Sequence, residues 1–241
     1  MTTEMYFSVD VETDGDCPGT SSMLSIGIVS LDPETQEPHE EFCRTLKRLP
    51  DARPMNETME WWDKFPQQWA ETRKDPMEPA AVMLEIEEFV KTNLKAASGA
   101  FKKEFVPVFV ASPAGFDFTF YYYYAHRFLG RSVFGFSALD LKSYCMALSD
   151  CPYLLVKRNR LPEWVSKLPH THNALEDARQ QADEFRKILA WRKEHLLVPK
   201  ALKQEEIAEV TPETKVEAAV PGRLFAPSLP PIEYWLRTTH E

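Results

Sequence analysis

The order of the hydrophobic patterns constrains the fold of this 241-residue chain more than any other feature. Residues 5–12 (MYFSVDVE) predict a β-strand in which Phe7, Val9 and Val11 point to one side and the residues between them to the other. Two further strand-like segments follow at residues 23–32 and 39–46. The short connections between these segments indicate an antiparallel meander.

Beyond residue 55, helix-like and strand-like segments alternate. Apolar residues at helical spacing predict helices at residues 56–64, 78–97, 118–130 and 173–196. Pro66 is expected to act as a breaker of the first of these helices, and the apolar run at residues 105–112 predicts a buried strand. A short strand that leads into a helix is expected at residues 137–149. Strands followed by alternating helices and strands are typical of an α/β fold with a mixed sheet.

The composition changes near the end of the chain. Residues 1–198 are predicted to form one domain, because the chain is 44% hydrophobic and long enough for one substantial core. Residues 199–241 contain six of the 19 prolines and little apolar periodicity, so we expect a Pro-rich tail that is disordered or docked on the domain. Its aromatic end also makes it a candidate binding segment for a protein partner, and a homodimer is left open.

The composition predicts an intracellular protein whose overall charge would not attract a polyanionic substrate. No apolar run is long enough to cross a bilayer, so we expect no membrane association. The N-terminus lacks a secretory pattern, and the four cysteines form no C-x-x-C pair, which together indicate a cytoplasmic protein. The net charge of -9 means that a polyanionic substrate must be attracted locally, by bound cations or by a basic patch. One candidate patch, which equally fits a solvated loop, comprises Lys157, Arg158, Arg160 and Lys167.

Two acidic residues share one face of the first predicted strand. Asp10 and Glu12 are two positions apart, so both carboxylates leave the same side. Carboxylates about 4 Å apart repel each other by roughly 4 kcal/mol, and a divalent cation between them reverses the sign of that energy. Mg²⁺ and Mn²⁺ prefer such oxygen ligands. Taken alone, the pair also fits a strand with one solvated face.

Three more polar residues lie near helix starts. Asp117 follows the predicted buried strand, and His172 and Asp177 flank the start of the last predicted helix. Each of them also fits a capping or helix-dipole role. If the sheet and the last helix bring all four acids to one edge, only cations make the cluster stable. Two metal ions are a known clamp for phosphodiester cleavage, and a neutral imidazole with a pKa near 6.5 suits a general base.

The spacing of these residues resembles the DEDDh branch of the 3'-5' exonucleases, which includes RNase T, oligoribonuclease and proofreading domains. The D-x-E-T-x-G motif of that family is matched from Asp10 to Gly15, the F-D pair by Phe116 and Asp117, and the H-x-A-x-x-D-A motif by residues 172–178. The order and separations agree, and the similarity spans residues 5–195.

The resemblance implies a ribonuclease H-like fold, a mixed five-stranded sheet flanked by helices. It implies two divalent ions, Mg²⁺ or Mn²⁺, held by Asp10, Glu12, Asp117 and Asp177, with His172 as the base that orients or deprotonates water. It also implies a single-stranded RNA or DNA 3' end as substrate and release of nucleoside 5'-monophosphates. Substrate contacts are expected from the backbone at Thr13 and from Phe116.

Two features leave the substrate open. Many family members carry His-Asn ahead of the second motif, where this chain has Ser112 and Pro113. Trp61 and Trp62 could stack on bases, although packing is the favoured interpretation of the pair. Alternative functions are a binding or scaffolding module that recruits a partner through the tail, and a phosphoesterase for a small nucleotide-linked substrate.

Overall fold

The computed structural model describes residues 3–149, 152–156, 165 and 171–195. The chain divides into two units, Met1–Arg186 and Lys187–Glu241. The predicted domain boundary at residues 198–199, the Pro-rich tail and the basic patch at residues 157–167 lie outside the described residues, so these expectations stay predictions.

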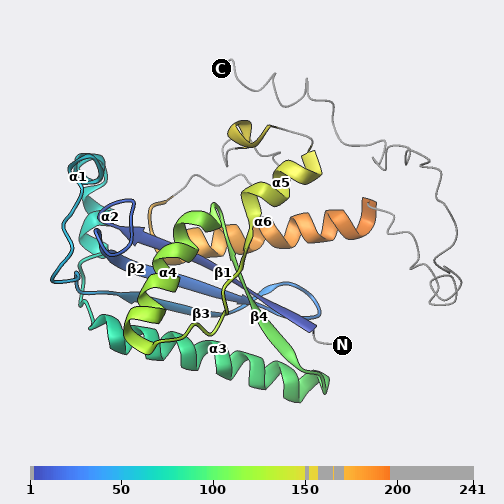
Figure 1. Cartoon of the computed structure of the whole chain (residues 1–241). Helices are drawn as coiled ribbons and strands as arrows, with labels where there is room; N and C mark the ends of the chain where they lie inside the picture. The colour runs from blue at the N-terminus through green and yellow to red at the C-terminus, as the bar shows by residue number, and fades with distance from the viewer. Residues whose placement is uncertain (1–2, 150–151, 157–164, 166–170, 196–241) are drawn as a thin grey trace, which may run out of the picture. The chain divides into compact units, whose positions relative to one another are not determined.

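The centre of the first unit is a five-stranded mixed sheet (Figure 1). Its strand order is β3-β2-β1-β4-β5, with antiparallel pairing of β1 to β2 and of β2 to β3 and parallel pairing of β1 to β4 and of β4 to β5. The predicted mixed sheet and its N-terminal meander are therefore confirmed. The strands are β1 (Thr3–Thr13), β2 (Met23–Leu31), β3 (Pro38–Thr45), β4 (Phe105–Ala111) and β5 (Ala138–Asp140).

Alternation along β1 builds the core. Phe7, Val9 and Val11 are buried on the face that packs against α3 (Pro79–Phe101) and α4 (Ala114–Leu129). These two helices lie side by side along that face (Figure 1). α3 is amphipathic as predicted, and it runs past the expected end at residue 97.

The opposite face of β1 is also covered, although its residues are polar. The first half of α6 (Ala174–His195) lies there, and the Ser8 hydroxyl donates to the Ala178 carbonyl over 2.9 Å. Ser8 is fully buried as a result. A polar strand face can be buried at low cost when its groups find such partners.

The remaining helices are α1 (Asn56–Trp62), α2 (Pro66–Glu71) and α5 (Leu141–Ser149), with a short 3₁₀ turn η1 at Tyr153–Leu155. As expected, the first helix does not continue through Pro66; a further helix that was not expected, α2, begins at this residue. Proline fits the first helical position, where its missing N–H would have no helical partner. α4 begins at Ala114, earlier than expected, since the Asp140 carboxylate accepts the Ala114 N–H over 2.7 Å.

The parallel strands β1 and β4 pair only up to Ser8 and Val110. Beyond that point, side chains take over the backbone groups that the ladder leaves unpaired. The Gln181 amide nitrogen lies 3.1 Å from both the Val9 and the Val110 carbonyl oxygens, and Asp117 accepts the Val11 N–H over 3.1 Å. A site therefore opens at the carboxyl ends of these strands, where ligands bind in open α/β sheets.

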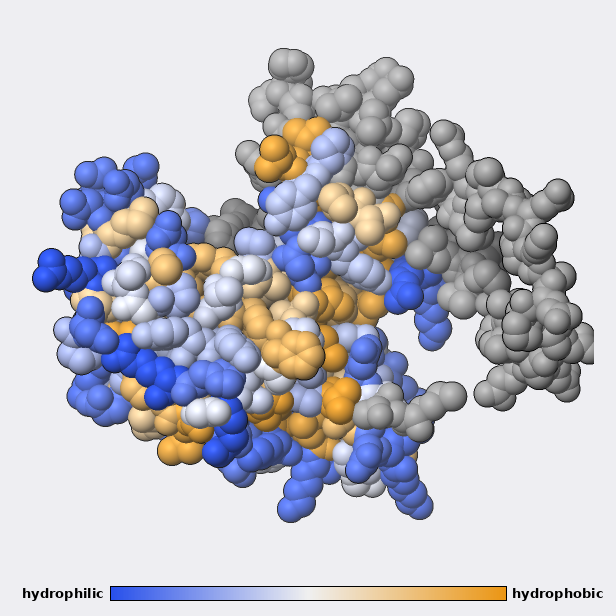
Figure 2. Space-filling view, viewed as in Figure 1, coloured by the Kyte–Doolittle hydropathy of each residue, from blue (hydrophilic) through white to orange (hydrophobic). Residues whose placement is uncertain are grey.

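Hydrophilic and hydrophobic residues are interspersed on the face that Figure 2 shows, with hydrophobic residues near the centre and along the lower edge. Large apolar side chains exposed within the described residues are Leu84, Val106, Phe136, Tyr153 and Leu154. Among the same residues, no helix combines the length and the apolar character that a membrane span requires.

Candidate active site

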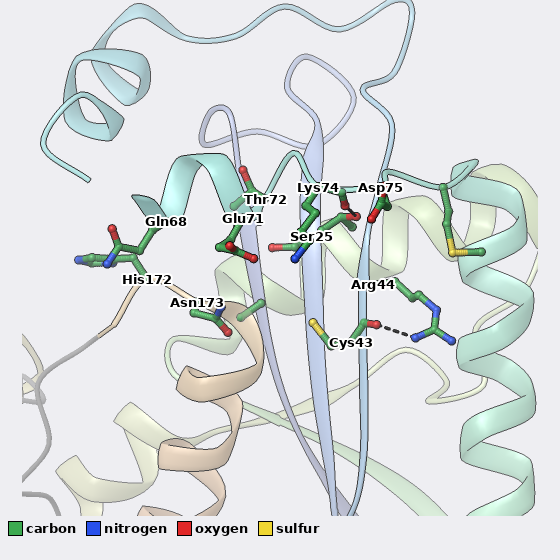
Figure 3. Close-up of a pocket in the computed structure, with 13 residues that line it drawn as sticks. Ser25, Cys43, Arg44, Gln68, Glu71, Thr72, Lys74, Asp75, His172 and Asn173 are labelled. Carbon is green, nitrogen blue, oxygen red and sulfur yellow. Dashed lines mark hydrogen bonds between the residues drawn. The ribbon is translucent and has the colours of Figure 1, made fainter. Parts of the chain in front are cut away.

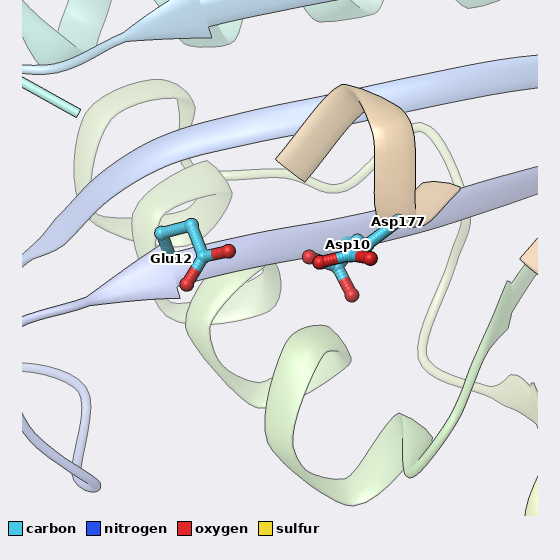
Figure 4. A group of neighbouring side chains, drawn as sticks. All are labelled: Asp10, Glu12 and Asp177. Atoms are coloured by element: carbon cyan, nitrogen blue, oxygen red, sulfur yellow. The ribbon is translucent and has the colours of Figure 1, made fainter. Parts of the chain in front are cut away.

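Three carboxylates meet where β1 passes under the start of α6. Asp10 and Glu12 project from β1 and Asp177 from the first turn of α6 (Figure 4). One ligand oxygen of each lies within 4.8 Å of the others. Glu12 and Asp177 are buried and Asp10 is half-buried. The structure thus brings together residues 167 positions apart in the sequence, from 10 to 177.

A glycine in β2 permits this close approach. Gly27 is the register partner of Asp10. A Cβ atom on Gly27 would lie 2.3 Å from the Ala174 carbonyl oxygen and 2.5 Å from the Leu175 nitrogen. Backbone atoms at such distances leave no room for any side chain. The first turn of α6 can therefore descend onto β2 and deliver Asp177 to Asp10 only because residue 27 is glycine.

Asp117 enters the same region from α4. It lies in the first turn of that helix, is 4% exposed, and accepts the Val11 N–H over 3.1 Å. Its charge also contributes to the raised pKa of Glu12, which places it near that carboxylate. All four predicted acids therefore belong to one electrostatic cluster.

Glu12 is the most strongly perturbed member of this cluster. Burial raises its pKa well above the ordinary value, and the negative charges of Asp177 and Asp117 raise it further. Its Oε1 atom is buried and has no hydrogen-bond partner among the described residues. A buried carboxylate oxygen without a donor, surrounded by like charges, fits a site that holds cations. The donor set is entirely oxygen, which suits Mg²⁺ or Mn²⁺.

The predicted base, His172, and one predicted metal ligand, Asp177, both lie at the turn that leads into α6. Asp177 Oδ1 accepts the Thr171 N–H over 3.0 Å and lies 3.2 Å from the Thr171 hydroxyl. The Asn173 side chain accepts the N–H groups of the first turn of α6, as a helix cap does. Between them, His172 has a left-handed backbone with a φ of 57°. The chain thus turns sharply at His172, immediately beside the acidic cluster.

A cavity of about 320 Å³ is lined by Asp10, Glu12 and Asp117 and also borders His172. Thr13 lines it, but its hydroxyl donates to the Gly15 carbonyl over 2.6 Å. Phe116 lines it as well and packs on Phe120. Ser112 and Pro113 form part of the same wall.

The two tryptophans of the α1 region differ in their surroundings. Trp62 is 2% exposed, and its Nε1–H donates to the Thr13 carbonyl over 2.9 Å, as the packing interpretation predicted. Trp61 is half-buried, lines the cavity and contacts the ring of His172 with centroids 4.6 Å apart. A second hollow of about 370 Å³ borders His172 and Asn173 and extends under α2 (Figure 3).

Sequence reasoning missed three residues that shape this site. Gly27, Thr171 and Gln181 carry no charge and are not among the matched positions of the three motifs. A glycine inside an otherwise apolar strand is a known signal of close backbone approach. Gln181 follows Asp177 by one helical turn, which places it on the same face of α6. Its role is seen only in the structure, where its amide group joins the carbonyl groups of Val9 on β1 and Val110 on β4.

The chain is similar to known nucleases over most of its length. Residues 5–189 match the family model of the 3'-5' exoribonuclease Rv2179c-like domain. The chain is 34% identical over 191 residues to the 3'-5' DNA exonuclease Cap18 of Escherichia coli, a span that covers 77% of this chain and 91% of that protein.

Solved structures share the fold. The nuclease domain of 3'hExo, a DEDDh family member bound to rAMP, superposes with a TM-score of 0.57 and 11% identity over 77% of this chain and 92% of that chain. The zinc-bound complex of E. coli ExoI with single-stranded DNA gives a TM-score of 0.57 and 16% identity over 80% of this chain and 42% of that chain. The expected ribonuclease H-like architecture is thereby confirmed.

Proposed function

The chain belongs to the Rv2179c-like 3'-5' exoribonuclease family and is a 3'-5' exonuclease of the DEDDh type, and we propose that it acts on the 3' end of single-stranded nucleic acid. The products are nucleoside 5'-monophosphates, and two divalent ions, Mg²⁺ or Mn²⁺, serve as cofactors. The names of the similar proteins include both RNA and DNA as substrates, so both belong in the test.

The convergence of Asp10, Glu12 and Asp177 within 4.8 Å carries this proposal. Asp117 adds a fourth negative charge that acts on Glu12. These four residues would hold the cations. When bound, two cations supply the positive charge that stabilises the attacking and leaving oxygens of a phosphodiester.

The other residues have roles that follow from their places around the cavity. His172 borders the cavity beside the acids and takes the proton of the attacking water. Thr13 and Phe116 line the wall and contact the terminal nucleotide. The negative charge of the whole chain does not oppose binding, because the cations neutralise the site locally.

A degradation assay on matched substrates tests the proposal. RNA, single-stranded DNA and duplex DNA of one sequence, each labelled at the 5' end, are incubated with Mg²⁺, with Mn²⁺ or with EDTA. We expect a ladder that shortens from the 3' end, in either metal but not in EDTA, and nucleoside 5'-monophosphates as the chromatographic product.

The matched control is Asp10→Asn, which removes one charge with little change of shape and is expected to abolish cleavage. Full-length RNA and DNA that persist in both metals would contradict the proposal. Cleavage of a dinucleotide alone, with longer oligonucleotides intact, would favour a phosphoesterase for small nucleotide-linked substrates instead.

A further inference from the structure

The imidazole of His172 packs against two aromatic rings from a different part of the chain. The Trp61 ring meets it nearly perpendicularly, at 86° and 4.6 Å between centroids. The Phe65 ring lies 4.3 Å away at 56°. The two aromatic rings also contact each other at 4.9 Å. Tilted and perpendicular ring pairs are the preferred arrangements, so these contacts favour the observed orientation of the imidazole.

The backbone holds Phe65 firmly in this position. Phe65 lies at the junction of α1 and α2, where its N–H donates to the Trp62 carbonyl over 2.8 Å. Its own carbonyl accepts the Trp69 N–H over 2.9 Å. These bonds fix the backbone from which the ring extends, and contacts with Trp61 and His172 hold the ring itself.

Hydrogen bonds attach the segment that carries both rings to the end of β1. The Trp62 indole N–H donates to the Thr13 carbonyl over 2.9 Å. The Met55 N–H, at the start of α1, donates to the Asp14 carbonyl over 2.8 Å. Both acceptors directly follow Glu12 in the chain. The rings therefore keep a defined position relative to the acids.

The backbone of His172 is held between two residues that bond to the start of α6. Its φ of 57° places it at a sharp turn between Thr171, which bonds to Asp177, and the cap residue Asn173. The rings of Trp61 and Phe65 contact the imidazole that extends from this turn.

We propose that Trp61 and Phe65 are positioning residues that clamp the His172 imidazole in the orientation required for proton transfer. The clamp rests on the proposed role of His172 as the base. Proton transfer is sensitive to misplacement, and about 1 Å of error can lower a rate on the order of 100-fold. An alternative role for Trp61, stacking on a nucleobase, would serve substrate binding instead.

Kinetics on the full chain separates these two roles. Trp61→Leu and Phe65→Leu are expected to lower kcat by roughly tenfold or more while KM stays unchanged, since the loss affects only the transition state. Trp61→Phe and Phe65→Tyr, which keep a ring, should restore most of the activity. A raised KM with an unchanged kcat would overturn the clamp and favour base stacking.

Two controls make the result specific. Trp69→Leu changes a ring in the same segment that packs on Trp62, at 5.5 Å, so it reports any general loosening of α1 and α2. We expect it to leave kcat near wild type. In a His172→Asn background, Trp61→Leu should add no further loss, because residues that act through one group are not additive. A full additional loss in that background would contradict the proposal.

A spectroscopic readout tests the clamp without any activity. In metal-free protein, the imidazole ring protons of His172 are assigned by NMR from their absence in His172→Asn. Their shifts should be displaced by the two neighbouring rings, should move toward ordinary values in both Leu variants, and should persist in Trp69→Leu. Ordinary shifts in the wild type would overturn the clamp, whereas a displaced signal without nuclease activity would retain it and remove the proposed function.

Discussion

At the scale of one residue, Glu12 shows that a group needed in the site can lower the stability of the metal-free fold. Burial and the charges of Asp177 and Asp117 raise its pKa. A raised carboxyl pKa stabilises the fold only where the group is protonated, so this contribution is lost as the pH rises through the folded-state pKa. Ionising Glu12 therefore destabilises the metal-free protein, and a bound cation reverses that effect.

The substitution Glu12→Gln should separate these opposing effects. In EDTA at pH 7, we expect the variant to gain on the order of 1 kcal/mol in unfolding free energy, because a buried carboxyl group whose ionisation is unfavourable beside Asp177 and Asp117 is replaced by a neutral amide. With Mn²⁺ at about 100 times its Kd, the wild type should gain roughly 2.7 kcal/mol and the variant much less. Thermal denaturation with and without the metal measures both differences. A variant that is less stable than wild type in EDTA would contradict the account of the cluster.

The backbone of His172 determines which substitution tests its role most cleanly. Asparagine adopts a positive φ more readily than alanine, so His172→Asn removes the imidazole and keeps the turn. We expect kcat to fall by roughly 10²- to 10⁴-fold, with the Mn²⁺-induced thermal shift unchanged. A lost thermal shift would show that the substitution disturbed the acidic cluster rather than the base alone.

At the scale of elements, the site depends on how closely α6 approaches β2 and β1. Three contacts set this distance: the bare backbone of Gly27 under Ala174, the Ser8 hydroxyl on the Ala178 carbonyl, and the Gln181 amide between two strands. None of these three contacts involves a predicted metal ligand or the predicted base. They place Asp177 opposite Asp10, so the acids form a cluster only while α6 stays seated.

The substitution Gly27→Ala should unseat the start of α6. Its Cβ would meet Ala174 backbone atoms at 2.3 Å, which cannot move cheaply. We expect a loss of roughly 1–3 kcal/mol in stability, as overpacking typically costs, and a marked loss of Mn²⁺ affinity and of cleavage. Differential scanning calorimetry, with metal titration at a temperature where the variant is folded, measures both.

Gly99→Ala is the matched control for that substitution. Gly99 lies within α3, and a Cβ there would meet nothing within 4 Å. The same chemical change should stabilise the protein by about 0.5–1 kcal/mol through helix propensity, with metal affinity unaltered. Equal effects of the two substitutions on metal binding would refute the role given to Gly27.

For the molecule as a whole, we expect folding stability to fall in acid because ion pairs that join separate elements are lost. Glu87 on α3 accepts a two-pronged hydrogen bond from Arg131, at 2.8 and 3.1 Å, and also pairs with Lys91. These bonds lower the pKa of Glu87 to about 2. A lowered carboxyl pKa gives stability that is present above the ordinary value of 4.5 and is lost as the pH falls toward 2.

The substitution Glu87→Gln should therefore matter at neutral pH and not in acid. We expect the unfolding free energy at pH 7 to fall by about 1 kcal/mol, because both cationic partners are largely exposed and screened. The difference from wild type should shrink between pH 4.5 and pH 2. Urea denaturation across this range measures it. Glu88→Gln, which alters an exposed neighbour that accepts from Thr92, should show no comparable dependence.

Much of the fold could be predicted because secondary structure depends on neighbours in the chain. The alternation of Phe7, Val9 and Val11 identifies β1, and helical periodicity identifies α3 and α6. Errors arose where a boundary depended on a distant partner: α4 starts at Ala114 because Asp140 caps it. α2 was missed because Pro66 has opposite meanings at the start and in the middle of a helix.

The sequence by itself determined which groups are available to the site: four acids and a histidine in motifs whose order and spacing are local properties. Only the tertiary structure decided how they meet. Four residues that shape the site contact groups far from them in the sequence: Gly27, Gln181, Trp61 and Phe65. The physical reason is that a motif records side-chain chemistry along one dimension, whereas close approach and ring packing exist only once the strands and helices have been brought together.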